Sequence, residues 1–207
     1  MKISYAITVC NELEEVKRLV NFLLLYKRKE DEIVILFDEK NGTDEVFDYI
    51  ESQVHDCEVF CEKFEGHFAD WKNLLTSHCT GKYIFQIDAD ELPSEDLIKG
   101  LPYILEQNPD TDIYLVPRVN TVEGLTHEHI RQWRWTVNEK GWVNYPDFQM
   151  RIYRNTPTVQ WKNKVHEVLE GYKSWATLPI EDEEFVLYHP KTIERQEKQN
   201  NYYDTLC

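Results

Sequence analysis

The acidic run at residues 88–91, Asp-Ala-Asp-Glu, directly follows Tyr83–Ile87, an apolar segment typical of a buried strand. Ligands of open α/β sheets bind at the carboxyl ends of the strands, so these carboxylates stand where a substrate would lie. Alternating aspartates can bind a hard cation such as Mg²⁺ or Mn²⁺, which can bridge diphosphate oxygens. The run could instead be an acidic turn before a helix that begins at Pro93 and Ser94, and the pattern alone leaves both interpretations open.

The first half of the chain alternates strand-like apolar segments with segments whose apolar residues recur at helical spacing. This alternation indicates βαβ units and a largely parallel sheet. Asn11 and Glu14 have the spacing of a capping box at the start of the first helix. The strands predicted in this half are Ile3–Val9, Glu32–Phe37, Cys57–Cys61 and Tyr83–Ile87.

The second half of the chain is less regular. From Asn120 to Tyr145 it is rich in Trp, His and Arg with little period, which predicts a functional loop region. Its aromatic side chains could stack on a sugar ring or could form a lid over the core. A polar helix is expected from about Thr192 onward. The further predicted strands are Thr111–Val116, Gln149–Tyr153, Thr158–Trp161 and Phe185–Tyr188.

The composition fits a single α/β domain. With 207 residues, 42% of them hydrophobic, the chain can bury a substantial core. Its formal net charge of −15 disfavours electrostatic binding of nucleic acid. The apolar runs are too short to span a bilayer and the first residues do not resemble a signal peptide, so we expect a cytoplasmic protein. The five scattered cysteines suit a reducing compartment, and Cys57 and Cys61 lack the second ligand pair of a zinc site.

Three stretches resemble, in order and spacing, the nucleotide-binding segments of family 2 glycosyltransferases: ISYAITVCNE, IVILFDEKNGTDE and FADWKNLLTSHCTGKYIFQIDADE. A fourth, FQMRIYRNTPTVQWKNKVHEVLEG, resembles the acceptor-side segment of the short members that build lipopolysaccharide cores. The resemblance implies a GT-A fold, a mixed and mostly parallel sheet with helices on both faces. It implies a single domain over residues 1–207, with residues 1–95 binding the nucleotide sugar and residues 96–207 the acceptor.

The same resemblance implies an inverting transfer of a hexose from a nucleotide diphosphate sugar, expected to be UDP-linked, to a hydroxyl acceptor such as a glycan. The cofactor would be Mn²⁺ or Mg²⁺, bound by Asp90 and Asp88 with His189 approaching it. His166 competes for this last role, and a lone histidine is often structural. The positions that match the donor-binding residues of the family are Thr8, Val9, Cys10, Glu12, Asp38, Lys72, Asp88, Ala89 and Asp90.

Three of the matched donor positions also have a plain structural interpretation. Glu12 could complement the dipole of the first helix, and Asp38 could be a free carboxylate at a strand end. Lys72 could be a solvated lysine on a helix. The type of residue alone therefore does not decide the role of any of them.

An inverting transfer needs a base that takes the proton of the acceptor hydroxyl, and a carboxylate is expected. Glu167, at the expected start of an acceptor-side helix, is the first candidate and Asp147 the second, although each could be an ordinary capping or surface carboxylate. Lys191, Arg195 and Gln199 recur at helical spacing and could clamp phosphate oxygens or form a solvated face.

Other functional classes fit the sequence less well. No glycine precedes Gly42, so the glycine-rich phosphate loops of nucleotidyltransferases, P-loop enzymes and dinucleotide-binding proteins are missing. The main alternative is a catalytically inactive GT-A-like module that binds a glycan or a nucleotide sugar. The joint presence of metal carboxylates and a candidate base argues against that alternative.

Overall fold

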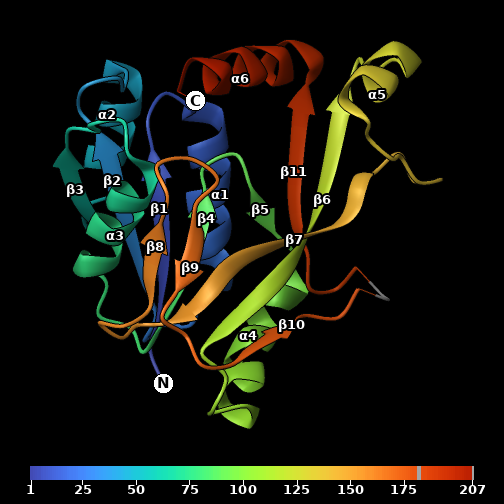
Figure 1. Ribbon diagram of the computed structural model, residues 1–207. Coiled ribbons are helices and arrows are strands. Elements are labelled where there is room, and N and C mark those ends of the chain that lie inside the picture. Colours follow the sequence, from blue (N-terminus) through green and yellow to red (C-terminus); the bar gives the residue numbers. More distant parts are fainter. Residues whose placement is uncertain (181–182, 207) are drawn as a thin grey trace.

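The computed structural model describes residues 1–180 and 183–206 (Figure 1). Its first half is a parallel βαβ array, as the alternation of the sequence predicts. The strands are β1 (Ile3–Val9), β2 (Glu32–Asp38), β3 (Glu58–Glu62) and β4 (Tyr83–Asp88), and the helices are α1 (Leu13–Tyr26), α2 (Asp44–Glu51) and α3 (Phe68–His78). The observed strand bounds lie within one residue of the predicted ones.

Both faces of this parallel array are covered, which is why its strands are continuous apolar runs in the sequence. Alternate residues of β1 belong to different hydrophobic cores. Tyr5 and Ile7 share one core with Val16 of α1, whereas Ala6 shares the other with Leu75 of α3. Buried side chains on both faces of β1 hold the strand rigidly, so its carboxyl end is a firm support for a site.

The second half adds antiparallel pairings and a separate hairpin. Its strands are β5 (Leu92–Pro93), β6 (Ile113–Glu123), β7 (Val143–Arg154), β8 (Gln160–Lys162), β9 (Val168–Glu170), β10 (Trp175–Thr177) and β11 (Leu187–Thr192). Its helices are α4 (Glu95–Gln107), α5 (His127–Trp133) and α6 (Ile193–Leu206). No helix in the described part of the chain is long and apolar enough to cross a bilayer.

The main sheet has the strand order β3-β2-β1-β4-β7-β6-β11-β5, and β10 pairs with β6. The run of parallel pairs from β3 to β4 is interrupted by β7, which runs antiparallel to β4, and parallel pairing returns where β11 joins β6. The crevice beyond the carboxyl end of β4 is the position where open α/β sheets bind ligands. In Figure 1, α6 crosses above the ends of the central strands, and the β8-β9 hairpin lies in front of β1 and β4. The predicted mixed, mostly parallel sheet with helices on both faces is confirmed.

The interpretation of Asn120–Tyr145 as an irregular region is wrong in part. The end of β6 and the start of β7 lie within it, because these strands pair from Ile113 with Tyr153 up to Asn120 with Val143. The ladder satisfies the backbone polar groups and so holds polar sequence in an extended form. The same region contains α5, whose first turn is capped by the side chain of Thr126.

Two local expectations also differ from the structure. The capping box of Asn11 and Glu14 does not form, since Glu12 occupies the N-cap position of α1 and its side chain makes no capping hydrogen bond. The last strand begins and ends later than predicted, and it therefore includes His189 and Lys191. Lys191 thus belongs to a strand and does not share a helical face with Arg195 and Gln199.

Candidate active site

A cavity of about 1330 Å³ opens at the carboxyl ends of β1, β2 and β4 and continues under β6, β7, β11 and α6. The structure brings every residue that the sequence singles out as a site residue to the wall of this one cavity. These residues are Thr8, Val9, Cys10, Glu12, Asp38, Lys72, Asp88, Ala89, Asp90, Asp147, Glu167, His189, Lys191 and Arg195. The role of each residue remains a prediction. These residues come from distant parts of the sequence, and the fold brings them together.

At one end of the cavity, two carboxylates order the backbone after β1 and β2. Glu12 accepts hydrogen bonds from the backbone nitrogens of Cys10 and Asn11 at 3.1 and 3.0 Å. Asp38 accepts from the backbone nitrogen of Phe64 at 3.1 Å and from its own turn. Burial raises the pKa of Cys10 to about 11, which favours the protonated thiol over the thiolate. This end of the cavity is therefore rigid and offers backbone groups to a ligand.

Asp88, at the end of β4, is neutralised by basic side chains of the protein. Arg151 of β7 donates to its Oδ2, and the Nζ of Lys72 lies 3.9 Å from its Oδ1. Gln86 donates to Oδ1 at 2.9 Å. Burial opposes the charge of Asp88, but Arg151 and then Lys72 outweigh it and hold the pKa well below its usual range. Asp88 is therefore an ionised carboxylate whose charge is already balanced.

Beneath Asp88 lies a fully buried carboxylate, Glu91, held between two arginines. Arg151 and Arg118 donate to its Oε1 at 2.7 and 3.0 Å. Its other oxygen accepts from the backbone nitrogen of Asp88 at 3.2 Å, which ties the acidic turn to the sheet. Neither Arg118 nor Arg151 was predicted from the sequence as a site residue. The signal that could have found them is a charged residue inside an apolar strand, because such a residue is buried only when it is paired.

Asp90 has different partners. The Nε2 of His189 lies 3.3 Å from its Oδ2, and the Nη2 of Arg195 lies 3.4 Å from the same oxygen. Burial disfavours the charge of Asp90 and so raises its pKa. The contact with His189 has the largest opposing effect, and the pKa is lowered to about 2. On its other side, the Nδ1 of His189 lies 2.7 Å from Oδ1 of Asn120.

Asp90 and His189 are the pair in this cavity that could hold a divalent cation. Among residues 1–180 and 183–206, no group of three or more His, Cys, Asp or Glu is arranged to hold a metal. Sites for Mg²⁺ nevertheless often use only one or two protein ligands and complete the shell with substrate phosphates and water. The facing oxygen and nitrogen of Asp90 and His189 fit such a site, whereas Asp88 is already paired with Arg151 and Lys72.

Lys72 and Glu167 form another part of the cavity wall. The Nζ of Lys72 lies 2.5 Å from Oε1 of Glu167 and 4.7 Å from the centre of the Trp161 ring. Trp161 is itself fixed, because its backbone exchanges two hydrogen bonds of 2.9 Å with the side chain of Asn73. Glu167 stands just before β9 of the hairpin, so the expected helix start at this position is wrong. The hairpin packs on α3 and presents the carboxylate to the cavity.

Asp147, the second candidate base, has both oxygens engaged. Arg118 and Asn120 donate to its Oδ2 at 2.7 and 2.8 Å, and Gln149 donates to its Oδ1 at 2.8 Å. Burial disfavours the charge, but Arg118 and these amides outweigh it and lower the pKa of Asp147. A carboxylate in this environment is a weaker base than its usual form.

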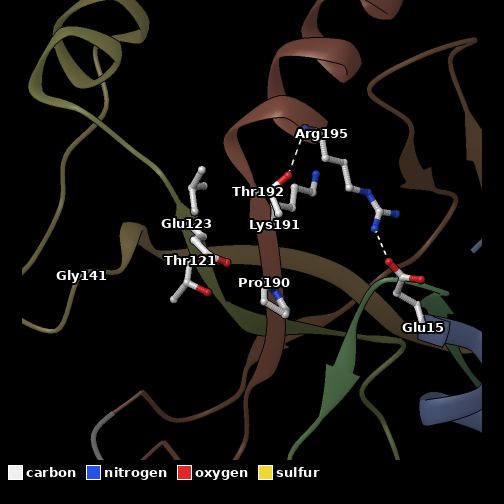
Figure 2. Close-up of a pocket in the computed structure, with 9 residues that line it drawn as sticks. Glu15, Thr121, Glu123, Gly141, Pro190, Lys191, Thr192 and Arg195 are labelled. Carbon is white, nitrogen blue, oxygen red and sulfur yellow. Dashed lines mark hydrogen bonds and ion pairs between the residues drawn. The ribbon is translucent and has the colours of Figure 1, made fainter.

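The start of α6 closes the cavity from above. Figure 2 shows Arg195 reaching across to Glu15 of α1, and the Nη1 of Arg195 lies 2.5 Å from Oε1 of Glu15. Lys191 donates to the side chain of Gln199, so two of the three residues expected on one helical face do meet, one from β11 and the other from α6. Burial lowers the pKa of Lys191. A second hollow of about 450 Å³ adjoins this corner and shares Glu15, Lys191 and Arg195.

Known proteins resemble this chain at the level of family and of fold. The profile of glycosyl transferase family 2 matches residues 4–170. The SPbeta prophage-derived glycosyltransferase SunS of Bacillus subtilis (strain 168) is 31% identical over 94 residues, which is 45% of this chain and 21% of SunS. A crystal structure of S. aureus TarS, residues 1–349, superposes with a TM-score of 0.62 at 14% identity over 92% of this chain and 60% of TarS 1–349. The same TarS region in complex with UDP-GlcNAc gives a TM-score of 0.54 at 14% identity over 89% and 60% of the two chains.

Proposed function

The chain belongs to glycosyltransferase family 2, and from this premise we propose that it moves a hexose from a UDP-linked sugar to a hydroxyl acceptor with inversion. One observation carries the proposal, namely that a single cavity joins the end of β4 to the Asp90-His189 pair and to the Lys72-Glu167 pair. The complexes of TarS 1–349 with UDP-GlcNAc and with UDP, in a protein of the same fold, support a nucleotide-sugar donor.

The donor would lie with its nucleoside against the end of β1 and its diphosphate toward Asp90. Glu12 and Asp38 stabilise the backbone at the nucleoside end, so Thr8, Val9 and Cys10 present fixed groups to the base. Lys191 and Arg195 line the cavity above Asp90 and would pair with phosphate oxygens. A divalent cation, Mn²⁺ or Mg²⁺, on Asp90 and His189 would stabilise the charge of the departing diphosphate.

The acceptor hydroxyl would lose its proton to Glu167. In one displacement, the acceptor oxygen bonds to the anomeric carbon while the bond from that carbon to the diphosphate breaks, and the hydroxyl proton passes to Glu167. Lys72 orients the Glu167 carboxylate at 2.5 Å, and both side chains are largely buried. Asp147 is less suited to this role, because Arg118 and two amides already occupy its oxygens.

Residues 1–95 and 96–207 would serve as donor and acceptor halves of one domain. The first range supplies β1, β2 and β4 to the cavity, and the second supplies Glu167, His189 and the aromatic side chain of Trp135. A half-buried indole at the cavity wall suits the C–H face of a sugar ring, which favours a glycan acceptor.

Calorimetric titration with UDP-, GDP- and CMP-linked sugars, each with Mn²⁺ and again with EDTA, tests the proposal. We expect the UDP-sugar to bind with Mn²⁺ and to lose most of its affinity with EDTA. Asp90→Ala should abolish this metal-dependent binding and the transfer itself while its circular dichroism stays unchanged. Asp56→Ala, which removes an exposed carboxylate outside the cavity, is the matched control.

Two outcomes would count against the proposal. Full activity of Asp90→Ala would remove the assignment of the cation to this pair. Binding of no nucleotide by the unaltered protein would favour a catalytically inactive module that recognises a glycan.

A further inference from the structure

His189 is held by a series of hydrogen bonds that begins at a partly buried arginine, Arg118. Arg118 donates to Oδ2 of Asp147 from Nε and Nη2 at 2.9 and 2.7 Å. The amide nitrogen of Asn120 donates to the same oxygen at 2.8 Å. The amide oxygen of Asn120 lies 2.7 Å from Nδ1 of His189. These four side chains connect the floor of the cavity to the candidate cation pair.

The donor and acceptor of each hydrogen bond in this series are fixed, because a carboxylate paired with arginine is ionised and can only accept hydrogen bonds. Asn120 must therefore turn its NH₂ group toward Asp147, and its oxygen must face the imidazole. An amide oxygen also only accepts, so the Nδ1 of His189 must carry a proton. In the neutral ring this leaves the lone pair on Nε2, which lies 3.3 Å from Oδ2 of Asp90.

The backbone fixes the geometry of this series of hydrogen bonds. Asn120 is the register partner of His189 between β6 and β11, and Arg118 is the register partner of Asp147 between β6 and β7. The participating side chains therefore stand on three adjacent strands of one sheet. His189 is 6% exposed, and a low local dielectric strengthens its hydrogen bond with Asn120.

We propose that Asp147 and Asn120 are positioning residues that fix the tautomer of His189, so that Nε2 offers a lone pair to a cation shared with Asp90. The cation rests on the proposed function. The tautomer rests on geometry, because the contact of Nδ1 with Asn120 at 2.7 Å is shorter than the contact of Nε2 with Asp90 at 3.3 Å. Histidines that bind metals depend on a hydrogen bond at the second ring nitrogen, and its loss lowers metal affinity by about 10- to 100-fold.

The tautomer can be measured directly by long-range ¹H–¹⁵N correlation spectra of protein with ¹⁵N-labelled histidine. The signal of His189 is assigned by its loss in His189→Gln, and spectra are recorded at a pH where its ¹⁵N shifts show a neutral ring. We expect the proton on Nδ1 in the unaltered protein and a shift toward Nε2 in Asn120→Leu. Asn120→Ala, a smaller change, serves the same purpose should the leucine variant fail to fold.

Gln149→Leu is the matched control, because Gln149 donates to the other oxygen of Asp147 and does not contact Asn120 through that bond. It should leave the tautomer of His189 unchanged. The inference is overturned if the unaltered protein carries the proton on Nε2, or if Asn120→Leu and Asn120→Ala keep it on Nδ1.

A second measurement is the affinity for Mn²⁺ in the presence of UDP, determined from the electron paramagnetic resonance signal of free Mn²⁺. Asn120→Leu should weaken binding by about 10- to 100-fold, and Gln149→Leu should bind as the unaltered protein does. Equal affinity in Asn120→Leu and the unaltered protein would contradict the positioning role. Absence of Mn²⁺ binding in the unaltered protein would contradict the proposed function instead, while the tautomer would still decide the inference.

Discussion

Asp88 and Asp90 are two residues apart, yet their surroundings differ in kind. Asp88 is paired with Arg151, whose side chain is 5% exposed and comes from the neighbouring strand β7. Asp90 is approached by Arg195, whose side chain is 34% exposed and comes from α6. The partner of Asp88 is thus buried within the sheet, whereas the partner of Asp90 is partly exposed at its rim. The two carboxylates themselves do not differ in this sense, since the side chain of Asp88 is 32% exposed and that of Asp90 is 18% exposed.

This difference suggests that the contact of Asp88 with Arg151 is permanent, whereas the contact of Asp90 with Arg195 can be exchanged for a ligand. Removing a partner from a buried ion pair leaves a charge without compensation, and this is strongly destabilising. An ion pair with a partly exposed partner contributes little to stability, so a ligand can replace it. We infer that Asp88 shapes the cavity together with Glu91, and that Asp90 is the carboxylate that faces the donor.

The largest effect is expected from replacing Glu167, the candidate base, which is linked to Asp88 through Lys72. In Glu167→Gln we expect kcat to fall by about 10²- to 10⁴-fold with little change in KM, because the amide keeps the shape but cannot take a proton. Steady-state kinetics of sugar transfer measure the effect. Glu170→Gln, an exposed position on the same hairpin, is the control. An unchanged kcat in Glu167→Gln would move the base to Asp147.

The next largest effect is a difference in the free energy of unfolding between variants of Arg151 and Arg195. Arg151→Met should lower the free energy of unfolding by about 3–5 kcal/mol, because the fully buried Glu91 would lose one of its two arginine partners. Asp88, whose side chain is 32% exposed, would also lose its ion pair with Arg151. Arg195→Met should lower it by less than about 1 kcal/mol. Urea denaturation followed by circular dichroism measures both. Equal losses in the two variants would remove the distinction between the permanent and the exchangeable contact.

The smallest expected effect is on donor binding at the rim. Arg195→Met should raise the Kd for the nucleotide-sugar by about tenfold, since one charge-assisted hydrogen bond to a phosphate is lost. Calorimetric titration measures this change. Arg18→Met on α1 removes the same charge from an exposed position outside the cavity and should leave the Kd unaltered. A Kd in Arg195→Met equal to that of the control would exclude contact with the diphosphate.

The first half of the fold could be predicted well because its signals are local. The strand Ile3–Val9 has the predicted bounds, and the acidic turn follows the end of β4 as expected. Strands buried on both faces are visible as apolar runs in any single sequence. The second half could not be predicted as well, because β6 and β7 are held extended by each other across polar sequence. Part of each strand was predicted, as Thr111–Val116 and Gln149–Tyr153, but the paired segments 117–123 and 143–148 carry no periodic apolar signal.

The fold class, the family segments and the carboxylates at the strand ends could all be predicted from the amino-acid sequence. The basic side chains that meet those carboxylates became visible only in the folded chain. Arg151 reaches Asp88 across 63 residues of chain, and His189 meets Asp90 across 99. The spacing of apolar residues along the sequence predicts which residues are buried and which secondary structure they form. Which charged side chains pair depends instead on strand register. Register is set by contacts between distant segments, and these exist only once the sheet has formed.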